Sequence, residues 1–463
     1  MIQSKTSRLW LQSAVVFVAF MSYFATTAFY LPNGAGPDYP LSRVAADFYL
    51  ENGRLATIPE DEAKMGFSMF GNSRLLRPPL GYASAAVVAK LRGTTLDENK
   101  ERYYSYRLAN AFYGALAVAA AFAALYIFFN SLFVALFGAL LIGLLPQFTF
   151  TASYLNDDGS AIAAVSLTAM SIALIFRQGA TLGNCLFFAF SVGLTIITKK
   201  AGWVFLPAAF LFYLGYILRF DKDFWVKHAA MAVVFVLAGG WWLIFNMLQY
   251  GWDDPILSKV INETAWRNTD VDLNRFGFVA EFGIGMRALL LENHGNFIGA
   301  TYMAVVGHLD WLVIRVGRLQ YVYYYIVVFG LIANVGFLFA EAVSSRLRSR
   351  RVWFEVILYI AIGLQVMAYV WTNLYNDVQI QGKYILPAFL PMLILSLSFY
   401  VKLFATKPVS AIWSNEQMGK VKFIMMGLVL LSPIVVHLDA LLSHVIPHYW
   451  PQSTTAVMWQ GLF

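Results

Sequence analysis

Residues 9–31 of this chain read LWLQSAVVFVAFMSYFATTAFYL, and this apolar stretch decides the fold class. It contains no charged residue, and Lys5 and Arg8 precede it. A helix needs about 20 mainly apolar residues to cross the hydrocarbon core of a bilayer. The stretch is longer than the apolar part of a signal peptide, and no small-residue cleavage site closes it at the usual distance. We therefore predict a first membrane-spanning helix that stays in place as an anchor.

Similar apolar stretches recur along the whole chain. Of the 463 residues, 59% are hydrophobic and 13% are charged, whereas soluble domains carry about 25% charged residues. The sequence thus excludes a soluble globular domain and predicts an all-α polytopic membrane protein with about 11 transmembrane helices. Besides residues 9–31, the predicted spans are residues 106–128, 132–149, 159–176, 183–198, 201–218, 228–249, 320–341, 354–371, 385–403 and 423–446.

Basic residues in the short loops predict the orientation, because loops rich in Lys and Arg stay on the cytoplasmic side. They fall on the side of the N-terminus at Arg177 and in residues 219–227, 346–351 and 402–422. We expect a bacterial inner (cell) membrane protein with a cytoplasmic N-terminus and a periplasmic C-terminus. The net charge of +7 then reports topology, and we expect no nucleic-acid partner.

Two long segments fall on the predicted outer side, residues 32–104 and residues 250–319. The first holds nine acidic and nine basic residues, so its net charge does not oppose export. Within it, residues 41–49 and 79–91 have the mixed apolar and polar pattern of helices that lie in a membrane interface. A large outer segment of this kind suits chemistry on a lipid-linked molecule.

Three acidic residues near the predicted outer face are candidates for catalysis. Asp38 lies within Gly-Pro-Asp-Tyr-Pro at residues 36–40, where two prolines stiffen the backbone. A general base needs such a fixed position, although Asp38 could instead cap the helix expected to begin near Leu41. Asp157 and Asp158 lie in the outer turn between the third and fourth spans, where they could simply complement the dipole of the next helix.

Two lysines on the outer side are candidates for binding an anionic substrate. Lys199 follows the fifth span, at a position where the positive-inside bias disfavours a cation. Its ammonium could meet a lipid-linked phosphate as a point charge, or it could snorkel to ordinary phospholipid headgroups. Lys383, between the ninth and tenth spans, is a second candidate for phosphate contact. Trp242 could contact substrate or belong to the interfacial aromatic belt.

Several common kinds of site are absent from the sequence. It contains no glycine-rich phosphate loop and no HExxH motif, and its six histidines are scattered. Its single cysteine, Cys185, excludes an intrachain disulfide and a multi-cysteine metal site. We therefore predict neither a metal nor a cofactor.

In their order along the chain, the motifs resemble the GT-C superfamily of polytopic glycosyltransferases, and most closely its bacterial branch DUF2142. In that branch the first outer loop opens with Pro-Pro-Asp-Glu-Pro-x-His, continues with Pro-Pro-x-x-Tyr and leads into the second span through Arg-x-x-Asn. The matching residues here are Pro37, Asp38, Pro40, Pro78, Pro79, Tyr82, Arg107 and Asn110. Further along, the matching residues are Leu145-Pro146, Ser153, Asp157, Thr198-Lys199, Trp242, Asn246, Tyr250-Gly251 and Gln381-Gly382-Lys383-Tyr384.

The resemblance implies transfer of one sugar, with inversion, from a polyprenyl-phosphate donor to an acceptor hydroxyl on the outer face. Asp38 would be the general base, supported by Asp157 or Asp158, and Lys199 and Lys383 would stabilise the leaving phosphate. The expected substrate-binding set is completed by Arg77, Tyr82, Tyr384 and Trp242. The acceptor would be a glycan, a lipid or an exported protein.

Two positions depart from the family pattern. Tyr39 replaces its Glu and Ser42 replaces its His, so Asp38 would act without a metal. The alternatives to an enzyme are a transporter or flippase of a polyprenyl-linked glycan, and a non-catalytic glycolipid-binding subunit. Eleven spans do not divide into two equal repeats and the acids gather at one face, which favours the enzyme over a transporter. We expect residues 1–403 to form the catalytic module, with residues 404–463 adding a cytoplasmic loop and the last span.

Overall fold

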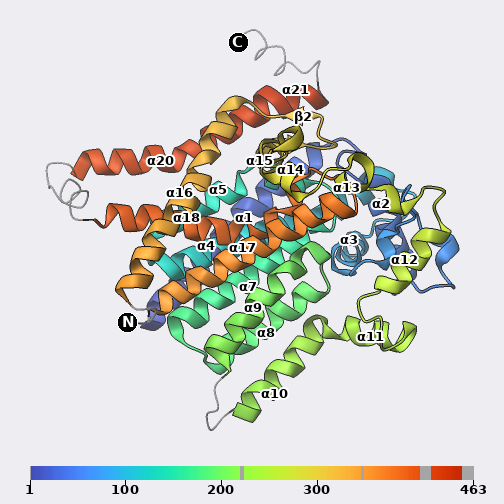
Figure 1. Cartoon of the computed structure of the whole chain (residues 1–463), viewed down its shortest axis with the longest axis horizontal. Helices are drawn as coiled ribbons and strands as arrows, with labels where there is room; N and C mark the ends of the chain where they lie inside the picture. Colours follow the sequence, from blue (N-terminus) through green and yellow to red (C-terminus); the bar gives the residue numbers. More distant parts are fainter. Residues whose placement is uncertain (1, 219–223, 346–348, 407–418, 451–463) are drawn as a thin grey trace.

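The computed structural model describes residues 2–218, 224–345, 349–406 and 419–450, and most of these are helical (Figure 1). Within these ranges, nine helical stretches are long and apolar enough to cross a membrane. The prediction of an all-α polytopic membrane protein is confirmed, whereas the count of eleven spans is not. Part of the predicted cytoplasmic positive charge, at residues 219–223, 346–348 and 407–418, lies outside the described residues.

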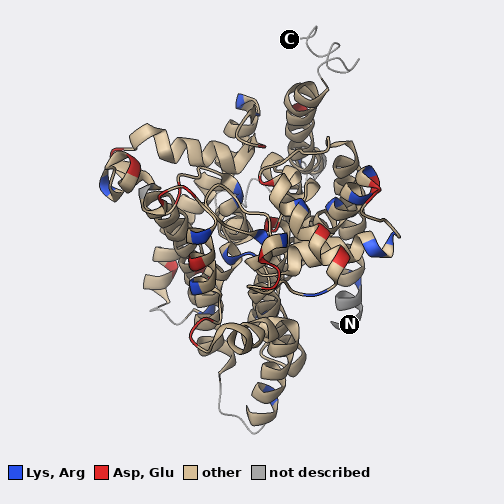
Figure 2. Ribbon diagram, turned by 90° about the vertical axis from the view of Figure 1, so that its right-hand side faces the viewer, with Lys and Arg blue, Asp and Glu red and all other residues tan. Residues whose placement is uncertain are grey.

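The nine stretches are built from α-helices, some of which continue into a 3-10 or π-helical turn. They are α1 (Ile2–Tyr30), α4 (Asn99–Phe129), α7 (Asp158–Gln178), η3 (Lys200–Phe205) with α9 (Leu206–Phe212) and η4 (Tyr213–Ile217), α10 (Phe224–Phe235) with η5 (Val236–Gly240) and α11 (Trp241–Tyr250), α16 (Arg318–Ser344), α17 (Arg350–Tyr375), η9 (Leu386–Ala388) with α18 (Phe389–Phe404), and α20 (Gly419–Ala440) with η11 (Leu441–Val445) and α21 (Ile446–Tyr449). Most of the ribbon in Figure 2 is tan, so charged residues are a minority along the chain.

The two remaining predicted spans are helical, but they are bent or short. Residues 132–149 are divided between α5 (Leu132–Gly143) and α6 (Pro146–Ser153), which are inclined to each other by 65°. Leu145 has extended backbone between them, because a residue that precedes proline disfavours the helical conformation. Residues 183–198 correspond to α8 (Leu182–Ile196), which has 15 residues. If the bent pair counts as one span, the described part of the chain has up to ten.

The two long outer segments pack against each other and form one layer, at the right and top of Figure 1. Arg267 pairs with Glu62 (3.4 Å), and the rings of Phe70 and Phe276 meet edge to face with centroids 4.7 Å apart. The elements of this layer are α2 (Tyr39–Asn52), η1 (Glu62–Lys64), η2 (Arg74–Leu76), α3 (Leu80–Leu91), α12 (Ser258–Arg267), η6 (Leu273–Arg275), α13 (Phe278–Phe282), α14 (Met286–Leu290), η7 (His294–Asn296), α15 (Phe297–Gly307), and the antiparallel pair β1 (His308–Leu309) and β2 (Ile314–Arg315). We call the face that carries this layer the outer face, following the predicted orientation.

Helix α4 lies at the centre of the bundle and packs against α1, α3, α5, α6 and α7. Its middle is rich in buried alanine, and small residues let membrane helices approach each other closely. At Gly114 the approach is so close that an added Cβ would lie 2.5 Å from the Cβ of Ala152 in α6.

The Arg-x-x-Asn motif of α4 fixes the ends of two other elements. The Arg107 guanidinium donates hydrogen bonds of 3.2, 2.6 and 2.6 Å to the carbonyls at the end of α1, those of Ala28, Leu31 and Pro32. These carbonyls lack partners within their own helix. One turn further on, the Asn110 amide donates to the carbonyl of Asn156 (3.1 Å). The motif therefore joins the start of the first outer segment to the turn between α6 and α7.

Gly382, in η8 (Gly382–Tyr384), packs directly on the backbone of α15. A Cβ at this position would lie 2.1 Å from the carbonyl carbon and oxygen of Ala304. Because a backbone cannot move aside as a flexible side chain does, glycine is required here, and Lys383 and Tyr384 are positioned by this contact.

We expect Gly382→Ala to destabilise the protein by about 1–3 kcal/mol, the usual effect of overpacking. The control is Gly363→Ala in α17, where nothing lies within 4 Å of the added Cβ. Replacing a helical glycine by alanine should be neutral or stabilising by up to about 1 kcal/mol. Thermal unfolding of both purified variants in one detergent checks the prediction, and equal melting temperatures would contradict it.

Candidate active site

Seven charged residues from separate parts of the chain meet at the outer ends of the helices. We call them the charge cluster. They are Asp38, Arg74, Arg77, Asp157, Asp158, Lys199 and Lys383. Three carboxylates thus face four cations in a region that is largely closed to solvent.

Asp38 precedes α2 and has a left-handed backbone, with φ 62° and ψ 16°. Asp38 occupies the N-cap position of this helix, as the alternative expected, but its side chain makes no capping hydrogen bond among the described residues. Instead its Oδ2 lies 2.5 Å from Nη2 of Arg74 and 3.9 Å from Nζ of Lys383. The Asp38 side chain is 30% exposed. A left-handed aspartate is strained by about 1–3 kcal/mol and is retained where the surroundings fix it.

Asp157 and Asp158 share the ammonium of Lys199. The distances from Nζ are 3.2 Å to Asp157 Oδ1 and 2.8 Å to Asp158 Oδ1. Asp157 also accepts a hydrogen bond of 3.2 Å from Nη1 of Arg77. Lys199 is 8% exposed, so its ammonium is directed inward and does not snorkel to bulk lipid.

Lys383 links the two halves of the charge cluster. Its Nζ lies 3.9 Å from Oδ2 of Asp38 and 3.9 Å from Oδ2 of Asp158. The Tyr384 ring lies beside both lysines, with its centroid 4.9 Å from Nζ of Lys199 and 5.6 Å from Nζ of Lys383. An aromatic face attracts a cation at such distances, which helps to hold both ammonium groups in place.

Burial and neighbouring charges act in opposite directions on these groups. Burial alone would lower the pKa of Lys199, but Asp157 and Asp158 outweigh it and raise that pKa well above its usual value. Burial would raise the pKa of Asp157, but Lys199 and Arg74 lower it. Burial lowers the pKa of Lys383, whose carboxylate neighbours are more distant. Lys383 is therefore the lysine of the charge cluster whose charge depends most on what binds beside it.

A cavity of about 620 Å³ adjoins the charge cluster on one side. Its wall combines residues from both outer segments, from η3 and from the end of α17, including Arg77, Lys199, Lys200 and Tyr384. Lys200 makes no ion pair with a carboxylate among the described residues. We call this the cationic cavity, because three basic side chains line it.

The donor set of the charge cluster does not fit a bound metal ion. Each of its carboxylates already has a Lys or Arg nitrogen within 4 Å. No group of three His, Cys, Asp or Glu side chains suited to a metal occurs in the part of the chain that the structure describes. A divalent cation would add charge to a region that holds more cations than anions, so no step is assigned to one.

Most of the predicted site residues come together in space. Asp38, Asp157, Asp158, Lys199, Lys383 and Arg77 belong to the charge cluster, and Tyr384 contacts it. Two predicted residues belong neither to the charge cluster nor to the wall of the cationic cavity as the structure describes it. Tyr82 is buried against Ser42, with a hydroxyl distance of 3.2 Å, and Trp242 packs 6.0 Å from Trp203. Their predicted substrate contacts remain predictions.

Arg74 is the member of the charge cluster that sequence reasoning missed. It is 9% exposed and lies against Asp38. Its sequence context, Ser73-Arg74-Leu75-Leu76-Arg77, contains two basic residues three apart and apolar residues between them. This spacing is a weak signal, because exposed helices show it equally often.

The family profile described as "Predicted membrane protein (DUF2142)" matches residues 21–393. The chain belongs to this family. A comparison with curated proteins finds no significant match.

Among solved structures, the Archaeoglobus fulgidus oligosaccharyltransferase tethered with an acceptor peptide has a TM-score of 0.52 and 14% identity, covering 92% of this chain and 54% of its own. The same enzyme in complex with Zn and sulfate has a TM-score of 0.50 and 14% identity, covering 98% of this chain and 52% of its own. ArnT from Cupriavidus metallidurans has a TM-score of 0.47 and 16% identity, covering 91% of this chain and 64% of its own. The chain of this DUF2142 protein thus spans between half and two thirds of these proteins. The likeness to the oligosaccharyltransferase shows that the fold is GT-C-like.

We expect Lys199→Met to be strongly destabilising, because it leaves Asp157 and Asp158 buried without their shared cation. Removing one partner of a buried ion pair costs about 3–5 kcal/mol. The control is Lys259→Met, which breaks the exposed pair with Asp253 and should change stability little. The double variant Lys199→Met, Asp158→Asn should regain part of the loss. Unfolding in detergent measures all three, and equal effects of the two single variants would contradict the assignment.

Proposed function

We propose that this DUF2142 protein is a membrane glycosyltransferase that moves one sugar from a polyprenyl-phosphate donor to an acceptor hydroxyl at the outer face, with inversion. The observation that carries the proposal is a carboxylate on strained backbone, Asp38, held by two cations in a charge cluster. Two other members of this cluster, Arg77 and Lys199, line the cationic cavity. The GT-C-like fold, which it shares with an oligosaccharyltransferase, supports this reading. We assign the catalytic module to residues 1–403.

The donor phosphate would bind in the cationic cavity. Arg77, Lys199 and Lys200 present basic groups there. Two carboxylates already engage the Lys199 ammonium. The negative charge on the leaving phosphate grows in the transition state. Fixed cations that interact with this growing charge accelerate the reaction more than cations that bind the ground state equally well.

Asp38 would accept the proton of the acceptor hydroxyl. Both cations lie closest to its Oδ2, so we assign proton uptake to Oδ1. The acceptor oxygen then bonds to C1 of the sugar, while the bond from C1 to the phosphate oxygen breaks and that oxygen keeps the electron pair. Attack from the face opposite to the leaving group inverts C1. Asp157 and Asp158 support the site by holding Lys199 and, for Asp158, Lys383.

The proposal is tested with purified protein in sealed vesicles that contain a labelled short-chain polyprenyl-phosphate sugar and an extract of envelope lipids and glycans. A transferase converts the label into a new product and releases polyprenyl phosphate. Movement of intact donor across the bilayer without conversion would support a flippase instead, and binding without either would support a non-catalytic subunit.

We predict that Asp38→Asn lowers turnover by 10²-fold or more, because a lost general base has about this effect. Asparagine tolerates the left-handed backbone as aspartate does, and its amide oxygen can still accept a hydrogen bond from Arg74 at this partly exposed position, so expression and donor binding should stay near normal. The matched control is Asp97→Asn, an exposed acid of the same outer segment, which should leave the rate unchanged. More than about a tenth of the rate remaining in Asp38→Asn would remove this residue from the role.

We also predict that activity survives a chelator of divalent cations, since Lys and Arg already neutralise the carboxylates of the charge cluster. The measurement is the initial rate after dialysis against EDTA, with and without added magnesium, manganese or zinc. A rate that is lost in EDTA and restored by one of these ions would show that a metal takes part.

A further inference from the structure

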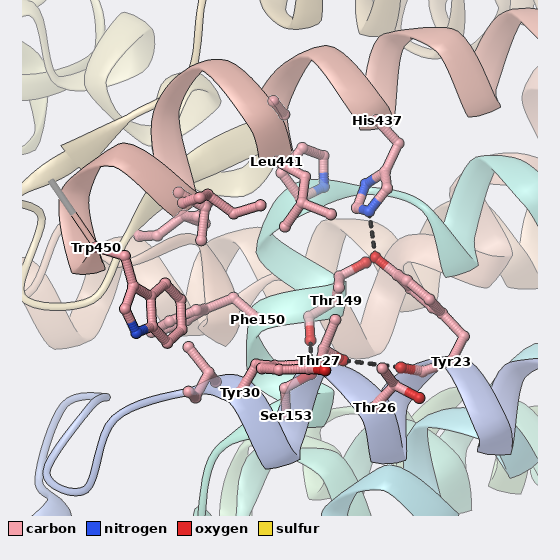
Figure 3. A pocket seen from close by; sticks show the side chains of 16 residues that line it. Tyr23, Thr26, Thr27, Tyr30, Thr149, Phe150, Ser153, His437, Leu441 and Trp450 are labelled. Atoms are coloured by element: carbon pink, nitrogen blue, oxygen red, sulfur yellow. Dashed lines mark hydrogen bonds between the residues drawn. The ribbon is translucent and has the colours of Figure 1, made fainter. Parts of the chain in front are cut away.

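A second cavity, of about 540 Å³, lies between α1, α6 and the last helical stretch α20–η11–α21 (Figure 3). It shares no lining residue with the cationic cavity among the described residues. No Asp, Glu, Lys or Arg occurs among the sixteen described residues that line it. Aliphatic and aromatic side chains dominate the wall, among them Tyr30, Leu31, Phe150, Leu441, Ile446 and Trp450. We call it the apolar cavity.

Most polar side chains in this wall are hydrogen-bonded to the protein itself. Thr27 Oγ1 and Ser153 Oγ are 2.7 Å apart. His437 donates from Nδ1 to the carbonyl of Leu144 (2.8 Å), and its Nε2 accepts from the hydroxyl of Tyr23, as Figure 3 shows. Because these groups already have partners, the cavity presents a surface that suits hydrocarbon and has little to offer a charged or strongly polar ligand.

The apolar cavity is continuous with the surface that faces lipid. Two of its walls belong to α1 and α20, both long enough to span a membrane. On α20, residues before and between those that line the cavity expose large apolar side chains, with Val435 at 60% and Leu438 at 45%. A lipid chain could therefore enter from the bilayer without passing through water.

The outer end of the apolar cavity adjoins the segment that holds Asp38. Leu309 lines the cavity, and the next residue, Asp310, accepts hydrogen bonds from the backbone N–H of Gly36 (3.1 Å) and from the hydroxyl of Tyr449 (3.0 Å). Tyr154, next to Ser153 in the wall, packs so closely on Gly36 that a Cβ there would lie 2.2 Å from its ring. Gly36 is two residues from the proposed base.

We propose that the apolar cavity holds a hydrocarbon chain of the acceptor, so that the acceptor is a lipid and not an exported protein. This inference rests on the proposed function. An extended peptide needs partners for its backbone N–H and C=O groups, and most polar groups of this wall are already paired. A lipid chain needs none, and a chain anchored here would bring its headgroup to the segment of Asp38.

The donor tail is the less suitable occupant, because a donor needs cations at its phosphate. The basic residues line the other cavity, and the turn between α6 and α7 separates the two. Ser153 at one end of that turn faces the apolar cavity, while Asp157 at the other end pairs with Arg77 and Lys199 in the wall of the cationic cavity. A tail in the apolar cavity would have to cross the charge cluster to reach its own phosphate.

The test uses full-length protein in nanodiscs with two photoactivatable probes. One is a phosphatidylglycerol with a diazirine in its acyl chain, and the other is a polyprenyl phosphate with a diazirine in its tail. Crosslinked peptides are mapped by mass spectrometry. Leu441→Trp fills the apolar cavity from η11, and Thr26→Phe fills it from α1 as an independent second variant. Leu438→Trp, on the exposed face of the preceding turn, is the matched control.

We expect the acyl probe to label peptides that contain residues 23–31, 149–153 or 437–446, and this labelling to fall at least tenfold in both filling variants but not in Leu438→Trp. Affinity for the polyprenyl phosphate probe should stay within twofold in all three. Labelling of the apolar cavity by the polyprenyl probe, or acyl labelling that the filling variants leave unchanged, would overturn the inference while leaving the proposed function intact. Failure of the proposed function appears separately, as a wild-type protein that converts no donor.

Discussion

The buried charge cluster is the constraint on which the outer face depends. Three carboxylates and four cations meet where α2, α7 and η3 begin, and none can lose its partners without leaving a charge uncompensated in a region of low dielectric. Such groups contribute little net stability compared with apolar packing, but they define a single arrangement. The first outer segment, the turn between α6 and α7, the start of η3 and η8 must all be in place before the charges balance.

The irregular backbone around the charge cluster has identifiable causes. The break before Pro146 turns α6 by 65° from α5 and carries the following turn inward. Asn110 holds that turn, and Gly382 lets η8 lie directly on α15. Non-helical backbone at such a depth is tolerated where protein or a cavity surrounds it. Here the non-helical segments lie around the side chains to which we assign chemistry.

The sequence predicted the helical class and located each long apolar helix in the described part of the chain, because a bilayer makes hydropathy a direct signal. The sequence also predicted that one face carries Asp38, Asp157, Asp158, Lys199 and Lys383, because the alternation of spans assigns each loop to a side. It did not predict how these residues pair. The capping role considered for Asp38 and the snorkelling considered for Lys199 follow from local context, whereas the observed partners are distant in sequence. Arg74 was missed for the same reason: its burial depends on the packing of the outer layer and not on its neighbours in the chain.

The bonds from Arg107 to the end of α1 bear on the order in which the protein is assembled. The carbonyl of Leu31 emerges from the ribosome 76 residues before the guanidinium that binds it. Throughout that interval the first outer segment is synthesised while the carbonyls at the end of α1 still lack this partner. When α4 packs against α1, both ends of the first outer segment become fixed. Formation of the outer layer is in this way coupled to insertion of α4. A chain interrupted before α4 would lack Arg107, which binds the carbonyls at the end of α1.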